Sequence, residues 1–267
     1  MAQLELHGLQ VHYEERGSGP PLVLVHGLGG STALWRDVDG DLARDFRVVA
    51  YDMRGAGRTA SGPPGPVAFE QLVGDLLALI EGLDLGPVSL VGHSLGGTVV
   101  LALAAGHPEH VAAVVGVGAP AELPEQSREG MRARAETVES EGMGAVAETV
   151  ARNGTAPSFH GHPERLGSFV ALLEANDPGG YAALCRVVAS IDITDRLGRI
   201  SAPVLLLGGD RDAVAPPAAR NAMAARIPGA RSVEVEDCGH IIPLERPAVL
   251  LQQVRSFCGL SPRARLP

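Results

Sequence analysis

Six short, nearly continuous apolar runs, each closed by glycine, aspartate or a polar cluster, place the strongest constraint on the fold of this chain. Strands that are buried on both faces of a parallel sheet have this composition, because helices cover both sides of the sheet. Two alternating segments near the start, LELHGLQ and VHYEERG, predict an additional β-hairpin. The six runs are PLVLVHG, FRVVAYD, VSLVGHS, VAAVVGVG, APVLLLGGD and RSVEVEDCGH.

Helical patterns lie between these runs. The segment FEQLVGDLLALIEGL repeats leucine at the spacing of one helix face, and TVVLALAAGHPEH and ERPAVLLQQVRSF predict two more helices. Because strands and helices alternate, the sequence predicts an α/β fold with a mostly parallel, eight-stranded sheet and flanking helices. The leucines of the first helix face are Leu72, Leu76, Leu79 and Leu83.

The alternation fails between about Ala121 and Ile200, where the sequence contains helical patterns but no convincing strand. REGMRARAETVESEGMGAVAETVARN and PERLGSFVALLEAND are helix-like, and GTAPSFHGH is a loop between them. Such an insertion forms a cap over the C-terminal edge of the strands, where ligands bind in open α/β sheets. We therefore expect residues 1–120 and 201–267 to form a core α/β domain and residues 121–200 to form the cap. The tail SPRARLP is expected to fray.

Composition excludes several kinds of partner. The net charge of −9 argues against a phosphate-binding surface, so no nucleic acid is expected as a ligand. No apolar run approaches the ~20 residues that span a bilayer, and the start lacks the pattern of a secretory signal, so no membrane association is expected. The three cysteines, Cys185, Cys238 and Cys258, are unlike any zinc pattern. A cytoplasmic protein without a bound metal fits these observations.

One short stretch, GHSLG at residues 92–96, matches the pattern G-x-S-x-G after the run VSLV and before a predicted helix. Glycine at positions 92 and 96 removes the Cβ atoms that would collide in so tight a strand-turn-helix corner. A serine held on such a turn exposes a fixed hydroxyl that can attack a carbonyl, so Ser94 is the candidate nucleophile. The alternative is that the glycines only allow the helix to pack closely on the strand.

A base and an acid follow in the order that hydrolases use. His240 stands after the last predicted strand, where its imidazole can take the serine proton and return it to the leaving group. Asp210 and Asp212 both follow the preceding strand. We expect Asp212, which lies further into the loop, to reach the imidazole and Asp210 to cap the amides of its own loop. The alternative is that both aspartates are ordinary turn residues.

The glycine-rich stretch VHGLGG after the first long strand can supply an oxyanion hole. We expect the backbone N–H groups of Leu28 and Leu95 to point at the developing negative charge. The stretch matches neither G-x-G-x-x-G nor a Walker A loop, so no nucleotide cofactor is expected. Gly27, His93 and Trp35 are candidates for the substrate pocket, although an ordinary core role for the tryptophan is an equal alternative.

These motifs resemble those of the α/β-hydrolase superfamily over nearly the whole chain. HGLGG, YDMRGAGRT, GHSLGG, GDRDAVAP and CGH stand in that family's order and at approximately its spacing. The length, the LW pair after the oxyanion loop and the compact helical cap are similar to β-ketoadipate enol-lactonases and related small esterases. The resemblance implies the α/β-hydrolase fold and a reaction that needs no cofactor.

The resemblance also bears on single residues. It favours Asp212 as the acid, because the family's acid commonly stands three residues after a glycine and four before a proline, here Gly209 and Pro216. It implies that Leu28, the residue after the His-Gly pair, is the oxyanion donor. In the family the turn that corresponds to YDMRGAGRT is mainly structural; here Thr59 replaces its usual serine.

The expected activity is therefore that of a serine hydrolase that cleaves a small carboxylic ester or lactone through an acyl-enzyme, as an enol-lactonase does. Carbon–carbon bond hydrolysis and cofactor-free perhydrolysis use the same triad and stay open, as does a ligand receptor with slow turnover. The sequence leaves the oligomeric state open.

Six arginines of the predicted cap are candidates for binding the substrate. Any one that faces the pocket can hold a carboxylate through two parallel hydrogen bonds. The alternative, favoured for most of them, is that they are solvated on helix surfaces. The six are Arg128, Arg132, Arg134, Arg152, Arg165 and Arg186.

Overall fold

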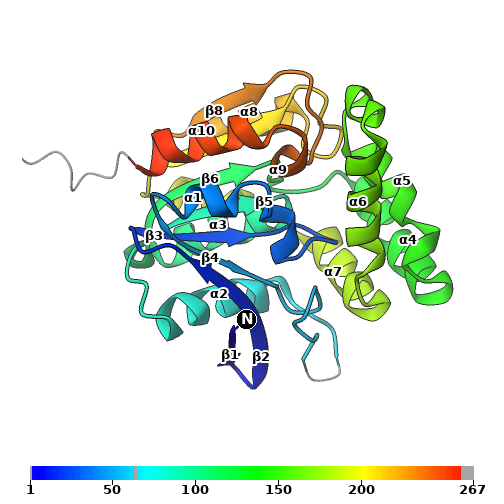
Figure 1. The fold of residues 1–267 in the computed structure, drawn as a ribbon, viewed down its shortest axis with the longest axis horizontal. Coiled ribbons are helices and arrows are strands. Elements are labelled where there is room, and N and C mark those ends of the chain that lie inside the picture. Colours follow the sequence, from blue (N-terminus) through cyan, green and yellow to red (C-terminus); the bar gives the residue numbers. More distant parts are fainter. Residues whose placement is uncertain (1, 63–64, 260–267) are drawn as a thin grey trace, which may run out of the picture.

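The computed structural model describes residues 2–62 and 65–259, so the predicted frayed tail SPRARLP lies outside the described residues. Its centre is an eight-stranded sheet with the order β1-β2-β4-β3-β5-β6-β7-β8. Neighbouring strands from β4 to β8 are parallel, and β2 pairs antiparallel with β1 and β4, which confirms a mostly parallel sheet (Figure 1). The strands are β1 (Ala2–Leu6), β2 (Leu9–Arg16), β3 (Pro21–Val25), β4 (Arg47–Tyr51), β5 (Val88–His93), β6 (Val111–Val117), β7 (Val204–Gly209) and β8 (Arg231–Val235).

The N-terminal hairpin is present, but its turn lies elsewhere than the two predicted segments imply. Those segments meet between Gln10 and Val11, whereas the chain turns at His7 and Gly8, and Leu6 pairs with Leu9. His7 and Gly8 have φ angles of 51° and 77°. A two-residue hairpin turn of this hand needs positive φ at both central positions, which glycine adopts without strain. The His-Gly pair therefore sets the register.

The strands β3 to β7 are buried on both faces, as their apolar runs predict. The same prediction is wrong for β8, which lies at the edge of the sheet and is mostly exposed. In β3, Leu22 and Leu24 pack into one core layer, and Val23 and Val25 pack into the other. The helices α1 (Asp39–Leu42) and α10 (Pro247–Cys258) cover the first layer. The second layer lies under α2 (Phe69–Gly82), α3 (Leu95–Gly106) and α8 (Pro217–Arg226). The leucine face predicted for α2 is buried at Leu72, Leu76 and Leu79.

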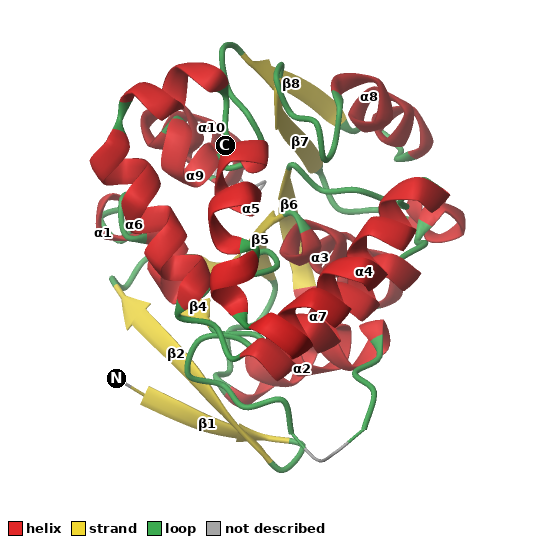
Figure 2. Ribbon diagram, turned by 90° about the vertical axis from the view of Figure 1, so that its right-hand side faces the viewer, coloured by secondary structure: helices red, strands yellow, loops and turns green. Residues whose placement is uncertain are grey.

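Between β6 and β7 the described chain forms helices and adds no strand to the sheet. We call α4, α5, α6 and α7 the cap helices; α4 packs along α7, and α5 packs on α6. Figures 1 and 2 show them together on one side of the sheet, beyond the ends of β3 and β5. Their bounds are α4 (Glu125–Glu141), α5 (Ala147–Gly154), α6 (Pro163–Glu174) and α7 (Pro178–Ser190), with short 3-10 helices η3 (Met143–Ala145), η4 (Pro157–Gly161) and η5 (Thr194–Arg199).

The first helix-like stretch of the cap forms two α-helices, α4 and α5, separated by η3. Gly142 adopts a φ of 80° and ends α4, and η3 then leads into α5. A left-handed residue cannot continue a right-handed helix, and glycine adopts that conformation at little cost. The break turns α5 away from α4, so that α5 can pack on α6.

Within residues 2–62 and 65–259, no helix is long and apolar enough to cross a membrane. The same residues contain no group of three or more histidine, cysteine, aspartate or glutamate side chains placed to hold a metal ion.

Candidate active site

Ser94 occupies a strained turn between β5 and α3. Its φ and ψ are 51° and −118°, a conformation that side-chain-bearing residues rarely adopt and that costs about 1–3 kcal/mol. The Ser94 backbone N–H donates to the Val117 carbonyl at 2.8 Å. A Cβ on Gly92 would lie 2.3 Å from the Gly96 carbonyl oxygen, and one on Gly96 would lie 2.3 Å from the Val25 oxygen. The glycines therefore permit close packing, and that packing holds the serine in its strained conformation.

His240 and Asp212 form a buried pair. The imidazole Nδ1 lies 2.8 Å from Oδ2 of Asp212, and the other carboxylate oxygen accepts the N–H groups of Val214 and Ala215, both at 2.8 Å. Burial alone would raise the pKa of Asp212, but the neighbouring His240 and these hydrogen bonds lower it below its ordinary value. The carboxylate is therefore charged, and it fixes the tautomer in which Nδ1 carries the proton and Nε2 can accept one.

The structure places Asp212, and not Asp210, against the imidazole. Asp210 instead accepts the Cys238 backbone N–H at 3.1 Å. Asp210 therefore caps an amide of the loop that carries His240, and not the amides of its own loop as the sequence predicts. The two aspartates are separated by one residue and point to different partners.

Ser94 and His240 line one cavity of about 770 Å³ that opens to solvent, together with Leu28, Leu95 and His93. In the described chain, neither the Leu28 nor the Leu95 backbone N–H donates a hydrogen bond. Two free amides beside a serine are what an oxyanion hole requires.

The loop that carries Leu28 is held by His26. Its Nδ1–H donates to the Gly27 carbonyl at 2.8 Å, and its Nε2 accepts the Met53 N–H at 3.0 Å. Gly27 passes directly beside the serine, since a Cβ there would lie 2.9 Å from the Ser94 Cβ. The predicted pocket residue Gly27 thus permits the close approach of two loops, and it is not among the residues that line the cavity.

His93 lines the cavity and joins the Ser94 turn to the loop of His240. Its Nε2–H donates to the His240 carbonyl at 3.0 Å, and its Nδ1 is buried without a partner. Burial, together with the charge of His240, lowers the pKa of His93 to about 3. His93 is therefore neutral at physiological pH.

Trp35 is not a pocket residue, so that prediction is wrong. Its side chain is completely buried in the core layer under α1 and α10, and it is absent from the cavity that contains Ser94. The 3-10 helix η1 (Thr32–Trp35) turns the indole into the protein interior, where burial of a large ring stabilises the layer.

Glu245 is a residue that the sequence reasoning missed. Its carboxylate is 3% exposed and accepts the N–H groups of Ala156 (2.7 Å), Gly239 (3.0 Å) and Ile241 (3.1 Å). Burial raises its pKa, and the three hydrogen bonds oppose that rise. Gly239 and Ile241 flank His240, so this side chain fixes the base's loop against the cap. The available signal was a single acid within the apolar stretch IIPLERP.

Asp52 was also missed as an individual residue. It is buried and accepts the Thr32 N–H at 2.6 Å and the Arg58 N–H at 2.9 Å. It therefore ties the YDMRGAGRT turn to the segment that follows the oxyanion loop, which is the structural role expected for that turn.

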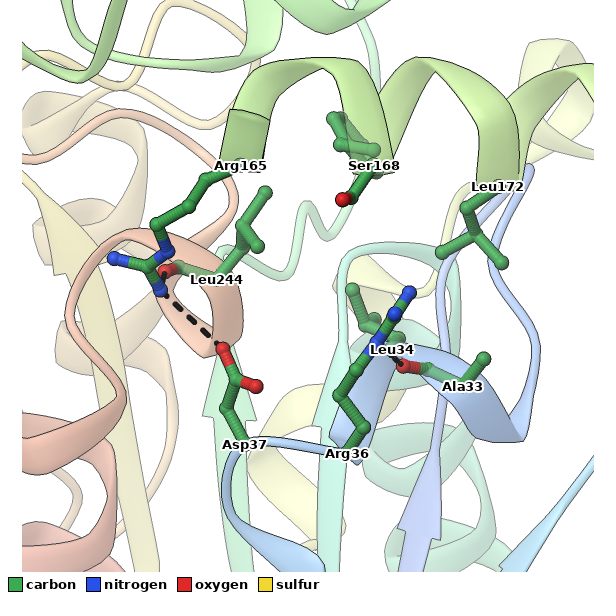
Figure 3. A pocket seen from close by; sticks show the side chains of 9 residues that line it. Ala33, Leu34, Arg36, Asp37, Arg165, Ser168, Leu172 and Leu244 are labelled. Carbon is green, nitrogen blue, oxygen red and sulfur yellow. Dashed lines mark hydrogen bonds and ion pairs between the residues drawn. The ribbon is translucent and has the colours of Figure 1, made fainter. Parts of the chain in front are cut away.

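A second cavity, of about 530 Å³, lies between α6 and η1 and contains none of the candidate triad residues (Figure 3). There Arg165 donates to Asp37 at 3.3 Å and to the Leu244 carbonyl. Phe169 lines both cavities.

Comparison with known proteins gives the family. The model of the family described as alpha/beta hydrolase fold matches residues 20–247. The chain belongs to this family. This hydrolase is similar in structure to the enol-lactonase from Burkholderia xenovorans LB400, with a TM-score of 0.92 and 31% identity over 97% of this chain and 100% of that one.

Two further comparisons agree. A thermophilic esterase from Thermogutta terrifontis, solved with malate bound, has a TM-score of 0.89 and 31% identity, and the match covers 96% of the hydrolase and 97% of the esterase. The 3-oxoadipate enol-lactonase 2 of Acinetobacter baylyi is 30% identical over 229 residues, which are 85% of this chain and 84% of that protein.

Replacing Ser94 should reveal the strain of the turn. We expect Ser94→Gly to be about 1–2 kcal/mol more stable to unfolding than Ser94→Ala, because glycine adopts the positive φ without a Cβ clash. Both variants lack the hydroxyl, so the difference between their unfolding free energies in urea reports the cost of the backbone conformation at position 94. Equal stabilities would contradict a strained turn.

Glu245→Gln should weaken both stability and catalysis. In the variant, the amide NH₂ would face a backbone N–H that donates to the Glu245 carboxylate in the wild type. We therefore expect a loss of about 2–3 kcal/mol in unfolding free energy. We also expect kcat for p-nitrophenyl acetate to fall on the order of tenfold, because the base's loop loses its anchor. The matched control is Glu141→Gln, at an exposed position of α4. If Glu245→Gln had the same unfolding free energy and kcat as this control, the anchoring role of Glu245 would be contradicted.

His93 should make stability depend on pH. An unfolded histidine takes up a proton near pH 6.5, whereas folded His93 stays neutral down to about pH 3. The unfolded state therefore binds more protons in this window, and stability falls as pH falls, by about 1.4 kcal/mol per unit. In denaturant titrations between pH 6.5 and 4.5, the slope should be smaller by about this amount in His93→Gln than in His162→Gln, at an exposed position. Buried His26, whose pKa burial also lowers, keeps its own contribution in both variants. An unchanged slope in His93→Gln would count against a neutral His93.

Proposed function

We propose that this protein is a serine hydrolase that cleaves a small carboxylic ester or lactone. The observation that carries the proposal is the buried His240–Asp212 pair, at 2.8 Å, beside a serine on a strained turn in one cavity. The named relatives, an esterase and two enol-lactonases, support both substrate types.

In the proposed reaction, the Ser94 Oγ attacks the carbonyl carbon while Nε2 of His240 takes its proton. The negative charge that develops on the carbonyl oxygen is stabilised by the Leu28 and Leu95 amides. When the tetrahedral intermediate collapses, His240 returns the proton to the leaving oxygen and an acyl-enzyme remains. Asp212 stabilises the imidazolium in both transfers. For a lactone, the leaving oxygen stays attached to the acyl chain.

Water completes the cycle. His240 takes a proton from water as its oxygen attacks the acyl carbon, and then gives the proton to Ser94 as the second intermediate collapses. The product is a carboxylic acid, and every proton transfer passes through the same imidazole nitrogen. The residues in place require no cofactor for these steps.

We also propose that residues 121–200 act as a substrate-selecting cap domain and that the protein works in the cytoplasm. The cap helices supply Met131, Val150 and Val188 to the cavity wall. Cys185, Cys238 and Cys258 are free and buried, which is typical of a reducing compartment.

A fluorophosphonate probe tests the nucleophile directly. We expect mass spectrometry to locate one adduct on Ser94, and we expect Ser94→Ala to lose both labelling and the turnover of p-nitrophenyl acetate. Equal activity in the variant would overturn the mechanism. Labelling without turnover would favour a ligand receptor on the same fold.

A further inference from the structure

A groove adjoins the cavity that contains Ser94. It has a volume of about 780 Å³, and Pro120 and Val214 line both this groove and the Ser94 cavity. Its walls are the segment that follows β6, the loop that follows Asp212, and helix α8. A ligand that reaches across the two shared side chains therefore contacts both cavities. We call it the α8 groove, and its other described lining residues include Ala121, Leu197, Ala215, Ala219, Ala222 and Met223.

The α8 groove suits a neutral, apolar ligand. Alanine and proline form most of its described wall, so little side-chain volume fills the space. Its ionisable lining residues among those described are Glu122 and Arg226, which carry opposite charges and are both exposed. Val214 is 37% exposed, and the described chain contains no other exposed large hydrophobic side chain. A ligand that covers Val214 removes this apolar surface from water, which favours binding.

Both walls of the groove are held by hydrogen bonds. On one wall, the Thr98 hydroxyl donates to the Pro120 carbonyl at 2.7 Å. The next carbonyl, that of Ala121, accepts the Ile193 N–H at 2.9 Å. On the other wall, Asp212 accepts the N–H groups of the second and third residues after it. The groove is therefore formed before a ligand binds, which lowers the entropy cost of binding.

The groove begins on the side of the site where the leaving group must depart. In the proposed reaction, Nε2 of His240 gives its proton to the leaving oxygen. The segment that leads to Pro120 passes beside this imidazole, since a Cβ on Gly118 would lie 3.0 Å from its Nδ1. Val214 follows Asp212, the partner of the imidazole, by two residues. Both side chains that lead into the groove are therefore two residues away from a group that lies against His240.

We propose that the α8 groove binds the alcohol half of the substrate and that this half is an extended, neutral, apolar group. The proposal rests on the proposed function and adds a substrate class to it. The class comprises esters of such alcohols, and lactones with a hydrocarbon chain on the carbon that bears the ring oxygen. Pro120 and Val214 contact the first carbons of the alcohol, and the alanines of α8 contact the carbons beyond them.

Two isomeric esters test which half of the substrate enters the groove. Hexyl acetate and ethyl hexanoate contain the same atoms, and each extends ethyl acetate by the same length, on the alcohol half or on the acyl half. Acid release at constant pH measures all three reactions. We expect kcat/KM for hexyl acetate to exceed that for ethyl acetate at least about tenfold, mainly through a lower KM. Equal values for these two esters would overturn the proposal.

Filling the groove assigns this preference to it. Ala222 is exposed on α8 and lines the groove, so the indole of Ala222→Trp would occupy the space. We expect the ratio of kcat/KM for hexyl acetate to that for ethyl acetate to fall at least about fivefold in this variant. The corresponding ratio for ethyl hexanoate should stay as in the wild type, and a fall in that ratio alone would overturn the assignment to the alcohol half.

Two further variants support the comparison. Ala218→Trp is the matched control, because Ala218 is exposed on the same helix and is not among the residues that line the groove. It should keep both ratios. Val214→Ser should lower the hexyl acetate ratio by less than Ala222→Trp does, because it removes apolar contact at one position and leaves the groove open.

A binding measurement separates this inference from the proposed function. By saturation-transfer NMR we expect 1-hexanol to bind the wild type, Ser94→Ala and Ala218→Trp, with the signal weakened in Ala222→Trp. If the fluorophosphonate probe labels Ser94 but Ala222→Trp keeps the wild-type ratio for hexyl acetate, the groove assignment is overturned and the hydrolase stands. If Ser94 is not labelled but 1-hexanol binding still depends on position 222, the groove stands as a site for an apolar alcohol and the hydrolase fails.

Discussion

The close approach of α3 to β3 and β5 is the constraint on which the rest of the site depends. The backbone at Gly96 passes so near the end of β3 that a Cβ there would lie 2.3 Å from the Val25 oxygen. The chain enters α3 at that distance through Ser94, which has a positive φ of 51°. The same contact brings the loop of Leu28 beside the serine, so one packing requirement produces both the exposed hydroxyl and its neighbouring amides.

The cap helices are bonded to the core at the loop of His240, the proposed base. The His240 backbone N–H donates to the Gly154 carbonyl at 2.8 Å, and Glu245 accepts the Ala156 N–H. A Cβ on Gly239 would lie 2.7 Å from the Ala156 nitrogen, so the two segments are in backbone contact. The end of α5 therefore forms part of the support of the imidazole as well as part of the cavity wall.

Much of this architecture could be predicted from the sequence because each element has a local signature. Strands buried on both faces appear as continuous apolar runs, and Ser94 and Asp212 follow two such strands, β5 and β7. His240 follows β8, an edge strand that is mostly exposed. The orientation of side chains could not be predicted where it depends on packing between elements. Periodicity does not reveal that Trp35 points inward, that Gly142 ends α4, or that Arg134 alone among the cap arginines faces the cavity. Glu245 was missed because its three partners come from two distant segments.

The hydrogen bonds between α5 and the His240 loop also determine which residues can be exchanged when the cap helices are replaced. To exchange the cap helices for those of a relative, one would ordinarily join the two chains at the ends of β6 and β7. That choice treats the inserted residues as an independent unit. Here residues 154–156 support the His240 loop, because Gly154 and Ala156 hydrogen-bond to it through backbone groups. A transplanted cap must therefore present a carbonyl and an N–H at these positions, whatever its side chains are. The segment that can be exchanged freely therefore excludes part of the cap, since residues 154–156 must stay matched to the His240 loop.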